Sequence, residues 1–419
     1  MDAESKIGEA ARAGAATLLG AVIAEQVMLR DGVARLGHLA PAEVARATSL
    51  AGLVLRKMAA LDKVLDRHMD RRPPLKVRNV CRVCAAEVLL EGIAAHGAVN
   101  GAVSIIKRDR KNARYSGLVN AVCRKLAHET IDEVPPQPLP KAIRGAVVGA
   151  FGEDATRAIE LVHGQRPPLD LTTKSDPQRW ADRLGGALLP NGSVRLQPGA
   201  QISALPGYEE GDWWVQDAAA AIPATLLGDV TGLRVLDLCA APGGKTMQLA
   251  ALGAKVTALD VSEVRMTRVA ENLKRTKLTA ELVVADALTW QPDAPFDAIL
   301  LDAPCSATGT IRRHPDLPFV RPSLDLKPLL ELQATLLRRA ADWLTPGGTL
   351  VYAVCSLIPA EGERQVARAI EDADLEPGAV QALDPAWQAA PYGLRLRPDF
   401  WPDHGGMDGF YAGLLKKPA

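Results

Sequence analysis

Residues 233–246, LRVLDLCAAPGGKT, combine an apolar strand, a tight turn and the start of a helix. Apolar and β-branched residues lead to Asp237, and a Pro-Gly-Gly turn at 242–244 then ends the strand. Glycine lets the backbone approach a ligand closely, and a helix beginning near Lys245 would direct its free N–H groups at that ligand. An ordinary strand-to-helix connection has the same pattern. The sequences of the neighbouring strands are therefore needed to distinguish a ligand-binding turn from such a connection.

Three further predicted strands also end near an acidic side chain. They are KVTALD, LVVADA and FDAILLDAPCS, at residues 255–260, 282–287 and 296–306. Asp260 suits the two hydroxyls of a ribose, Asp286 could accept from an adenine amino group, and Asp302 ends the last strand. Ligands of open α/β sheets bind at the carboxyl ends of strands, so these acids are expected at one site. The pattern is similar to the Rossmann-like fold of S-adenosylmethionine-dependent methyltransferases, and the turn lacks the GxGxxG of a nicotinamide enzyme.

The composition is typical of a soluble globular protein. The chain has 419 residues, enough for two or three domains, with 48% hydrophobic and 23% charged residues. No apolar run reaches the roughly 18 residues of a membrane span, and the first residues lack a basic region leading into an apolar core. We therefore expect a cytoplasmic protein with no membrane partner. The six cysteines are irregularly spaced and are expected to be reduced.

Positive charge is concentrated in one part of the chain. The net charge is zero, yet residues 71–125 hold 12 Lys and Arg against 3 Asp and Glu. Such a patch favours phosphate contacts, although a solvated helical surface has the same composition. The predicted RNA-binding residues are Lys107, Arg108, Arg110, Lys111, Arg114, Arg124 and Lys125.

Residues 5–130 have helical periodicity throughout. Apolar residues recur three or four positions apart, which predicts an α-helical bundle with short loops. Breaks are expected at 37–41, 71–74 and 93–103. Cys81 and Cys84 form a CxxC pair, but they lie on the apolar stripe and no second pair follows at zinc-finger spacing. We expect packed thiols there and no metal site in the protein.

The proline-rich stretch 131–140, IDEVPPQPLP, is typical of a linker. The predicted division is an all-α RNA-binding domain at 1–133, a linker at 134–140, a small α+β RNA-binding or bridging subdomain at 141–210 and a Rossmann-like catalytic domain at 211–419. Trp213 and Trp214 could stack on bases, but paired tryptophans before a helix are more often part of the core.

Two cysteines follow strands of the predicted catalytic domain. Cys305 lies in DAPCSATGT and Cys355 in LVYAVCS, so both are expected at the carboxyl edge of one sheet. A thiolate can make carbon 5 of a pyrimidine nucleophilic: it adds to carbon 6, carbon 5 takes the methyl group, and loss of the carbon 5 proton releases the enzyme. Asp302 is the candidate to stabilise this adduct at ring nitrogen 3. Either cysteine alone would be interpreted as an inert buried thiol, and Cys239 is expected to pack behind the cofactor.

Several motifs are similar to those of RNA 5-cytosine methyltransferases. They are LDLCAAPGGKT, LLDAPCSATGTIRRHPD, YAVCSLIPAEGE and DGFYA. In addition, AAHGAVNGAVSIIK and YSGLVNAVCRKL resemble the antitermination factor NusB. Together they resemble the RsmB (Sun, Fmu) family of ribosomal RNA cytosine methyltransferases over nearly the whole chain. The resemblance implies an all-α NusB-like bundle followed by an α/β Rossmann-like methyltransferase domain, with S-adenosylmethionine as cofactor and small-subunit ribosomal RNA as substrate.

The resemblance also implies roles for individual residues. Cys355 would be the nucleophile, Cys305 would help release the methylated product, and Asp302 would lie at the site. The implied cofactor-binding residues are Cys239, Ala240, Ala241, Pro242, Gly243, Gly244, Lys245, Asp260, Arg265, Asp286 and Asp302.

Three positions depart from the family pattern. Ala-Glu-Gly-Glu stands at 360–363 where Glu-Glu-Asn-Glu is expected, an expected asparagine near 173 is absent, and Gly101 stands in place of a glutamate. None of them involves the two cysteines.

Two alternative functions remain open from the sequence. Enzymes that methylate amines typically carry Asn-Pro-Pro-Tyr or Asp-Pro-Pro-Tyr at the fourth strand, whereas this chain has Asp-Ala-Pro-Cys at 302–305. The non-enzymatic alternative is an RNA-binding or antitermination-type assembly factor with a weak or vestigial methyltransferase domain. We expect a monomer.

Overall fold

The computed structural model of the chain describes residues 3–131, 136–323, 325–384, 387, 389–390 and 392–419. They form two compact units, one of Met1–Gln165 with Ile311–Leu324 and the other of Arg166–Thr310 with Asp325–Ala419. The four-part division inferred from the sequence stays a prediction, and residues 134–135 of its linker lie outside the described part of the chain.

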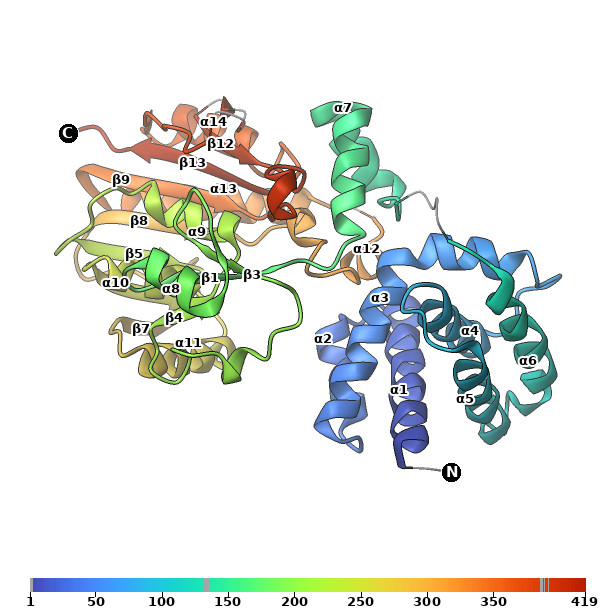
Figure 1. The fold of residues 1–419 in the computed structure, drawn as a ribbon. Coiled ribbons are helices and arrows are strands. Elements are labelled where there is room, and N and C mark those ends of the chain that lie inside the picture. Colours follow the sequence, from blue (N-terminus) through green and yellow to red (C-terminus); the bar gives the residue numbers. More distant parts are fainter. Residues whose placement is uncertain (1–2, 132–135, 324, 385–386, 388, 391) are drawn as a thin grey trace. The chain divides into compact units, whose positions relative to one another are not determined.

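The first unit, called the helical unit below, is built from helices joined by short loops (Figure 1). Its elements are α1 (Ala3–Glu25), α2 (Leu29–Gly32), α3 (Pro41–Asp66), α4 (Leu75–Leu89), α5 (Ala95–Arg108), α6 (Ser116–Lys125), α7 (Lys141–His163) and α12 (Leu317–Val320), with short 3₁₀ turns between several of them. Apolar residues at helical spacing, such as Leu19, Val54 and Cys84, are buried in one core. The predicted helical bundle is confirmed.

Two of the three predicted helix breaks are found. The chain leaves helix at 37–40 and at 67–74, but the third break covers only 90–94, so the prediction of a break through residue 103 is wrong. The Ala- and Gly-rich sequence there has the composition of a loop. In the structure α5 buries Ala98, Ala102 and Ile106 against the bundle, and this packing stabilises the helix.

Arg12 on α1 lies beside the glycine at position 101. A Cβ on Gly101 would lie 3.0 Å from Arg12 Nη1, and the Nε of the same guanidinium donates to Glu87 on α4 at 2.5 Å. A side chain at 101 would thus require the end of this arginine to shift by a few tenths of an ångström. Cys81 and Cys84 are buried in the bundle core, and the described residues contain no group of three or more side chains placed to hold a metal ion.

The segment after the DAPCSATGT motif packs within the helical unit. The Leu29 N–H donates to Asp316 Oδ2 at 2.7 Å, and Arg56 Nη1 donates to the Arg312 carbonyl at 2.5 Å. Phe319 packs against the core of the bundle. The 14-residue segment Ile311–Leu324 therefore belongs structurally to the helical unit, although it lies within the predicted catalytic domain in sequence.

The second unit, called the sheet unit below, contains a mixed sheet of nine strands (Figure 1). The strands are β5 (Arg234–Leu238), β6 (Lys255–Asp260), β7 (Glu281–Val284), β8 (Phe296–Asp302), β9 (Leu344–Val354), β10 (Glu376–Pro377), β11 (Ala389–Ala390), β12 (Gly393–Leu396) and β13 (Phe410–Lys416). Their order is β11-β12-β13-β9-β8-β5-β6-β7, with β10 beside β13. The strands from β5 to β9 are parallel, while β13 runs antiparallel to β9.

Helices connect the parallel strands, which brings all their carboxyl ends to one edge of the sheet. They are α10 (Gly244–Ala251), α11 (Glu263–Thr276) and α13 (Lys327–Asp342), and α14 (Glu363–Asp372) follows β9. The predicted Rossmann-like α/β architecture is confirmed. The predicted turn at 345–349 lies inside the bounds of β9 as a bulge: Leu344 pairs with Phe296 and Thr349 with Ala298, so the residues between them leave the ladder, and Gly347 has φ +76°. The Gly347 N–H donates to the Lys417 carbonyl at 3.1 Å.

A smaller four-stranded sheet precedes β5 in the same unit. It has the order β2-β3-β1-β4, from β1 (Leu169–Thr173), β2 (Ala187–Leu188), β3 (Val194–Leu196) and β4 (Trp213–Val215), with α8 (Pro177–Leu184) and α9 (Ala218–Thr225). Asp170 pairs with Arg195 at 2.6 Å and accepts from the Ala218 N–H at 3.0 Å. Trp213 and Trp214 are buried, so both belong to the core. None of the described helices is both long and apolar enough to cross a membrane.

Candidate active site

The acids and cysteines singled out in the sequence lie at one edge of the large sheet. Asp260 ends β6, Asp302 ends β8, and Cys355 directly follows β9. Because these strands are parallel, the residues at their carboxyl ends share that edge. Asp286 follows β7 at the same edge and is exposed.

The turn after β5 is shaped for a close approach to a ligand. Cys239 and Gly243 have φ values of +65° and +98°, in the left-handed region. A Cβ on Gly243 would lie 3.0 Å from Val269 Cγ1 on α11, so a larger residue would press against that helix. The helix α10 begins at Gly244, and the first N–H groups of a helix have no partner within it. The turn thus presents backbone donors to the site.

Asp260, at the end of β6, holds the backbone of this turn by a hydrogen bond. The side chain is buried, its Oδ2 accepts from the Ala241 N–H at 3.2 Å, and its Oδ1 accepts from the Ser262 N–H at 3.0 Å. Arg265 on α11 lies 3.3 Å from the same carboxylate and also donates to the Ala241 carbonyl. The remaining lone pairs of Asp260 are available to hydroxyl donors at the strand end.

Asp237, at the end of β5, is the most deeply buried acid of the site. Its Oδ2 accepts from Thr246 Oγ1 at 2.5 Å, whereas Oδ1 has no partner among the described residues. Burial raises the pKa of Asp237 to about 6. A buried carboxylate oxygen without a partner fits a cationic ligand. No role was predicted for this residue from the sequence, although an acid closing an apolar strand before the turn was a signal for one.

Lys245 connects the turn with the end of β8. Its Nζ donates to Asp302 Oδ2 at 2.8 Å and lies 5.3 Å from the centre of the Phe410 ring. Burial lowers the pKa of Lys245, but the negative charges of Asp302, Asp237 and the Cys355 thiolate outweigh it and raise this pKa overall. The lysine therefore stays charged and places a positive charge beside Cys355.

The structure brings Cys305 and Cys355 together. Their sulfur atoms are 3.4 Å apart, and the Gly309 N–H donates to the Cys355 carbonyl at 3.0 Å. The pKa of the Cys305 thiol is raised by its contact with Cys355, by burial and by the charge of Glu361. The raised pKa keeps Cys305 protonated while its sulfur lies in contact with that of Cys355.

Cys239 differs from this pair. Burial and the charges of Asp260 and Asp302 raise the pKa of its thiol, which keeps it protonated and poorly nucleophilic. Its position in the turn behind Ala240 agrees with the expected packing role.

Behind the two cysteines lies a buried polar cluster that was not predicted from the sequence. Ser306 and Ser356, each directly after a cysteine, both donate to Glu361 Oε2 at 2.5 Å. The repeated Cys-Ser pair was the available signal. A Cβ on Gly362 would lie 2.7 Å from both Arg395 and Tyr411, so the asparagine of the family pattern would not fit, and α14 still begins at Glu363.

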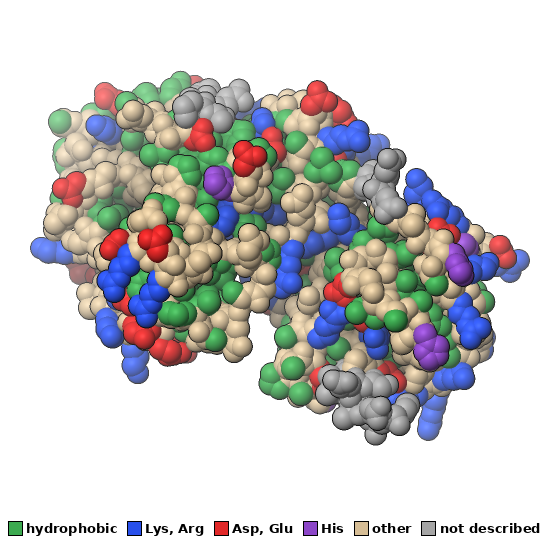
Figure 2. Space-filling view, viewed as in Figure 1, with side chains coloured by type: hydrophobic (Ala, Val, Ile, Leu, Met, Phe, Trp, Pro, Cys, Tyr) green, Lys and Arg blue, Asp and Glu red, His purple; other side chains and the backbone are tan. Residues whose placement is uncertain are grey.

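The seven predicted RNA-binding residues are all exposed, at the end of α5, the start of the following loop and along α6. Figure 2 shows Lys and Arg side chains gathered on the side of the helical unit where α6 lies. Arg108 forms an ion pair with Glu9 at 2.7 Å, which reduces its availability for phosphate. Their role in binding RNA stays a prediction.

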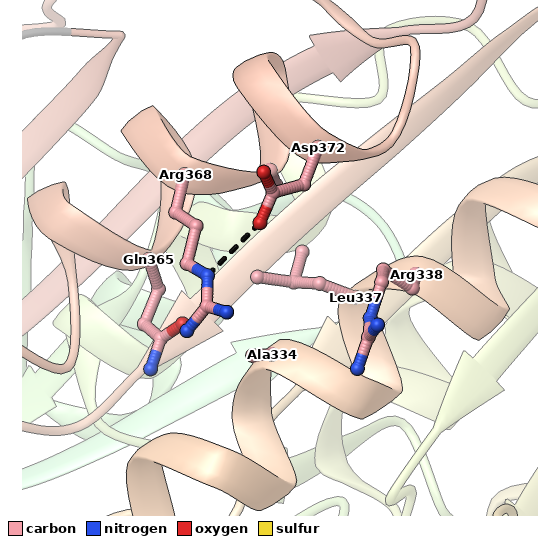
Figure 3. Close-up of a pocket in the computed structure, with 7 residues that line it drawn as sticks. Ala334, Leu337, Arg338, Gln365, Arg368 and Asp372 are labelled. Atoms are coloured by element: carbon pink, nitrogen blue, oxygen red, sulfur yellow. Dashed lines mark hydrogen bonds and ion pairs between the residues drawn. The ribbon is translucent and has the colours of Figure 1, made fainter.

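A hollow between α13 and α14 lies apart from the predicted site residues (Figure 3). It is lined by Ala334, Leu337, Arg338, Gln365, Arg368, Ala369 and Asp372. Arg368 Nε donates to Asp372 Oδ2 at 3.0 Å, and Gln365 Nε2 donates away from the hollow to the Leu330 carbonyl at 2.9 Å. Arg368, Asp372 and the Gln365 amide nitrogen thus already bind one another or the backbone.

Comparisons with known proteins agree with both units. The family described as 16S rRNA methyltransferase RsmB/F matches residues 224–416, and the NusB family matches residues 9–128. Ribosomal RNA small subunit methyltransferase B of Cronobacter sakazakii is 36% identical over 399 residues, which cover 87% of this chain and 88% of that protein. The protein of the same name from Klebsiella pneumoniae subsp. pneumoniae is 36% identical over 396 residues, with the same two coverages.

Two solved structures are also similar. PH0851 has a TM-score of 0.73 at 22% identity and covers 97% of this chain and 99% of its own, which shows a shared fold. A methyltransferase homologue from Pyrococcus horikoshii has a TM-score of 0.55 at 28% identity, covering 65% of this chain and 93% of its own.

Proposed function

The chain belongs to the RsmB/F family of 16S rRNA methyltransferases, and from this premise we propose that it transfers a methyl group from S-adenosylmethionine to carbon 5 of a cytosine in small-subunit ribosomal RNA. The observation that carries this proposal is the 3.4 Å separation of the Cys305 and Cys355 sulfur atoms at the carboxyl edge of the sheet. An amine already has a nucleophilic lone pair. Carbon 5 instead needs one group that adds to the ring and a second that removes a proton.

The first step is addition of the Cys355 thiolate to carbon 6 of the cytosine. Lys245 brings a positive charge to this edge of the sheet, where Asp302 holds it. As the carbon–sulfur bond forms, ring electrons move toward carbon 5 and nitrogen 3, where the positive charge of Lys245, positioned by Asp302, stabilises the developing negative charge. The bound methyl donor would supply the methyl carbon that carbon 5 takes, with the donor sulfur as the leaving group.

Bond formation at Cys355 also prepares Cys305 for its role. The contact and charge of Cys355 are among the causes of the raised pKa of Cys305. Once Cys355 is bonded to carbon 6 its charge is gone, which removes one of these causes; in the proposed scheme Cys305 gives its proton to solvent and acts as the base. Cys305 then takes the proton from carbon 5, the ring double bond re-forms, and the bond from carbon 6 to Cys355 breaks. The starting pair is restored and one proton is released for each methyl group.

The edge of the sheet also fits the proposed cofactor, S-adenosylmethionine. When bound, it supplies a methyl group on a positively charged sulfur. Asp237 has an unpartnered buried oxygen suited to a cation, the Gly243 turn allows close approach, and Asp260 is available to ribose hydroxyls. Residues 239–245 with Arg265 and Asp286 complete the proposed cofactor site.

We assign binding of ribosomal RNA phosphates to the exposed cations of α5, α6 and the loop between them, and we expect a monomer that acts in the cytoplasm. These assignments rest on exposure and positive charge.

Two cysteine variants test the proposal. Cys355→Ala should abolish methylation while cofactor affinity stays within twofold, because the thiol makes no cofactor contact that the proposal needs. Cys305→Ala should accumulate an RNA adduct that survives a denaturing gel, because Cys355 can add but the carbon 5 proton stays. Cys84→Ala, which removes a thiol from the helical core, is the control and should keep turnover.

Continued methylation by Cys355→Ala, or the absence of any adduct with Cys305→Ala, would contradict the proposed chemistry. Wild-type protein that binds RNA and cofactor without any methyl transfer would favour the assembly-factor alternative.

A further inference from the structure

The carboxylate of Glu361 lies at the centre of the polar cluster behind the two cysteines and is fully buried. Its Oε1 accepts from the Ser306 N–H at 2.8 Å and from Gln333 Nε2 at 3.1 Å. Its Oε2 accepts from the hydroxyls of Ser306 and Ser356, both at 2.5 Å. Among the described residues these four donors are neutral, so one buried negative charge is held by hydrogen bonds alone.

Two loops from different strands meet on this carboxylate. Ser306 is the neighbour of Cys305 in the loop after β8, and Ser356 is the neighbour of Cys355 after β9. Gln333 on α13 also donates to the Pro304 carbonyl at 2.8 Å. Cys305 therefore lies between two residues that are held in place, Pro304 by Gln333 and Ser306 by Glu361.

The two cysteines do not depend equally on Glu361. The Cys355 loop has further anchors, because Cys355 directly follows strand β9 and Arg395 donates to the Ser356 carbonyl, whereas the bond from the Leu357 N–H to Thr308 Oγ1 at 3.0 Å links the two loops. The residues around Cys305 form no regular secondary structure, and Ala307 has a positive φ of +58°. Two of the four hydrogen bonds to Glu361 come from Ser306. Loss of the carboxylate should therefore displace Cys305 more than Cys355.

The supports of Glu361 are themselves fixed. Gln365 on α14, drawn in Figure 3, donates to the Leu330 carbonyl at 2.9 Å and lies 3.4 Å from Gln333 Oε1. The hydroxyl of Tyr352 on β9 donates to the Glu361 carbonyl at 2.6 Å. Strand β9 and helices α13 and α14 thus hold the carboxylate in one place.

We propose that Glu361 is a positioning residue that holds Cys305 at reacting distance from Cys355, so that the carbon 5 proton can be removed and the product released. The inference rests on the proposed function and adds a residue to it. The charge of Glu361 also acts directly on Cys305, since it contributes to the raised pKa of that thiol.

The test is the ratio of covalent RNA adduct to methylated product in Glu361→Gln. Glutamine keeps the volume and one carbonyl oxygen, but it loses the charge and presents an NH₂ group to the two serine hydroxyls. We expect kcat to fall at least tenfold while KM for RNA and the Kd for S-adenosylhomocysteine change less than twofold. The adduct-to-product ratio should rise at least tenfold, because Cys355 still adds and Cys305 is displaced. Glu371→Gln, at an exposed glutamate of α14, is the matched control.

A structural role alone gives a different result. If Glu361 only stabilised the fold, adduct and product would decrease together with the folded fraction and their ratio would equal that of the wild type, which would overturn the inference. Ser306→Ala removes one hydroxyl and keeps the backbone N–H. If Glu361→Gln folds poorly, the adduct-to-product ratio is measured in Ser306→Ala instead. A wild-type protein that forms neither adduct nor 5-methylcytosine would overturn the proposed function and this inference with it.

Discussion

Replacement of Asp237 by asparagine should remove a pH-dependent loss of folding stability that the buried carboxylate causes in the wild-type protein without cofactor. The carboxylate is fully buried, one oxygen accepts from Thr246 and the other has no partner among the described residues. Its pKa is about 6, mainly because burial disfavours the charged form. In the unfolded chain an aspartate has a pKa of about 3.9.

The sign and size of the effect follow from these two pKa values. Because the folded pKa is the higher one, the folded protein binds a proton between about pH 6 and pH 4 while the unfolded chain does not, so stability rises as the pH falls through this window. A difference of about 2 pKa units corresponds to about 3 kcal/mol. The free energy of unfolding of Asp237→Asn minus that of the wild type should therefore be about 3 kcal/mol larger at pH 8 than at pH 4. The cost of the asparagine itself cancels in this comparison.

Tryptophan fluorescence during thermal unfolding measures this difference in the sheet unit alone. All seven tryptophans lie between residues 180 and 401, outside the segments that form the helical unit. For a unit of this size about 3 kcal/mol shifts the midpoint by roughly 6 to 12 °C. Asp286→Asn, at an exposed acid of the same edge, should show no such dependence on pH. If the unfolding midpoints of Asp237→Asn and wild type differ by the same amount at pH 4 and at pH 8, the reasoning is refuted.

Other predictions concern the cofactor and RNA sites. Asp260→Asn should weaken S-adenosylhomocysteine binding by roughly 10- to 100-fold in calorimetry, because charge-assisted hydrogen bonds to the ribose are lost and the Ala241 N–H loses its acceptor; unchanged affinity would remove Asp260 from the site. Charge reversal at Arg110, Lys111 and Lys125 should weaken RNA binding and reduce the slope of log affinity against log salt by about 0.7 to 0.9 for each phosphate that the variant no longer binds. Reversal of Lys255, at the amino end of β6, is the control, and an equal effect there would place the RNA site elsewhere.

Local sequence patterns were sufficient to predict which residues lie at the carboxyl edge of the large sheet. The apolar runs that form β5, β6, β8 and β9 are buried on both faces of the sheet, and such strands have a continuous apolar signal. Once the strands are parallel, the placement of Asp260, Asp302, Cys305 and Cys355 at one edge follows from topology alone. The edge strand β7 is more exposed, and it is shorter than its sequence pattern suggested.

Features that depend on distant contacts were not predictable in the same way. The residues of 95–103 are small and resemble a loop, and only the packing of α5 in the bundle makes them helical. Residues 345–349 contain a Pro-Gly-Gly turn signal, but Leu344 and Thr349 on either side of it both pair with β8, so the turn forms a bulge inside one strand. Glu361 matches the expected motif, but its role was not predictable, because its four donors come from three separate segments of the chain.

Tritium release from carbon 5 tests the central claim most directly. The substrate is unmodified small-subunit ribosomal RNA with tritium at carbon 5 of its cytosines, and both tritium in water and methyl groups in RNA are counted. The proposed mechanism predicts one tritium released for each methyl group transferred by the wild type and no release by Cys355→Ala. Methyl transfer that leaves the tritium on the RNA would show that another atom is methylated and would contradict the mechanism.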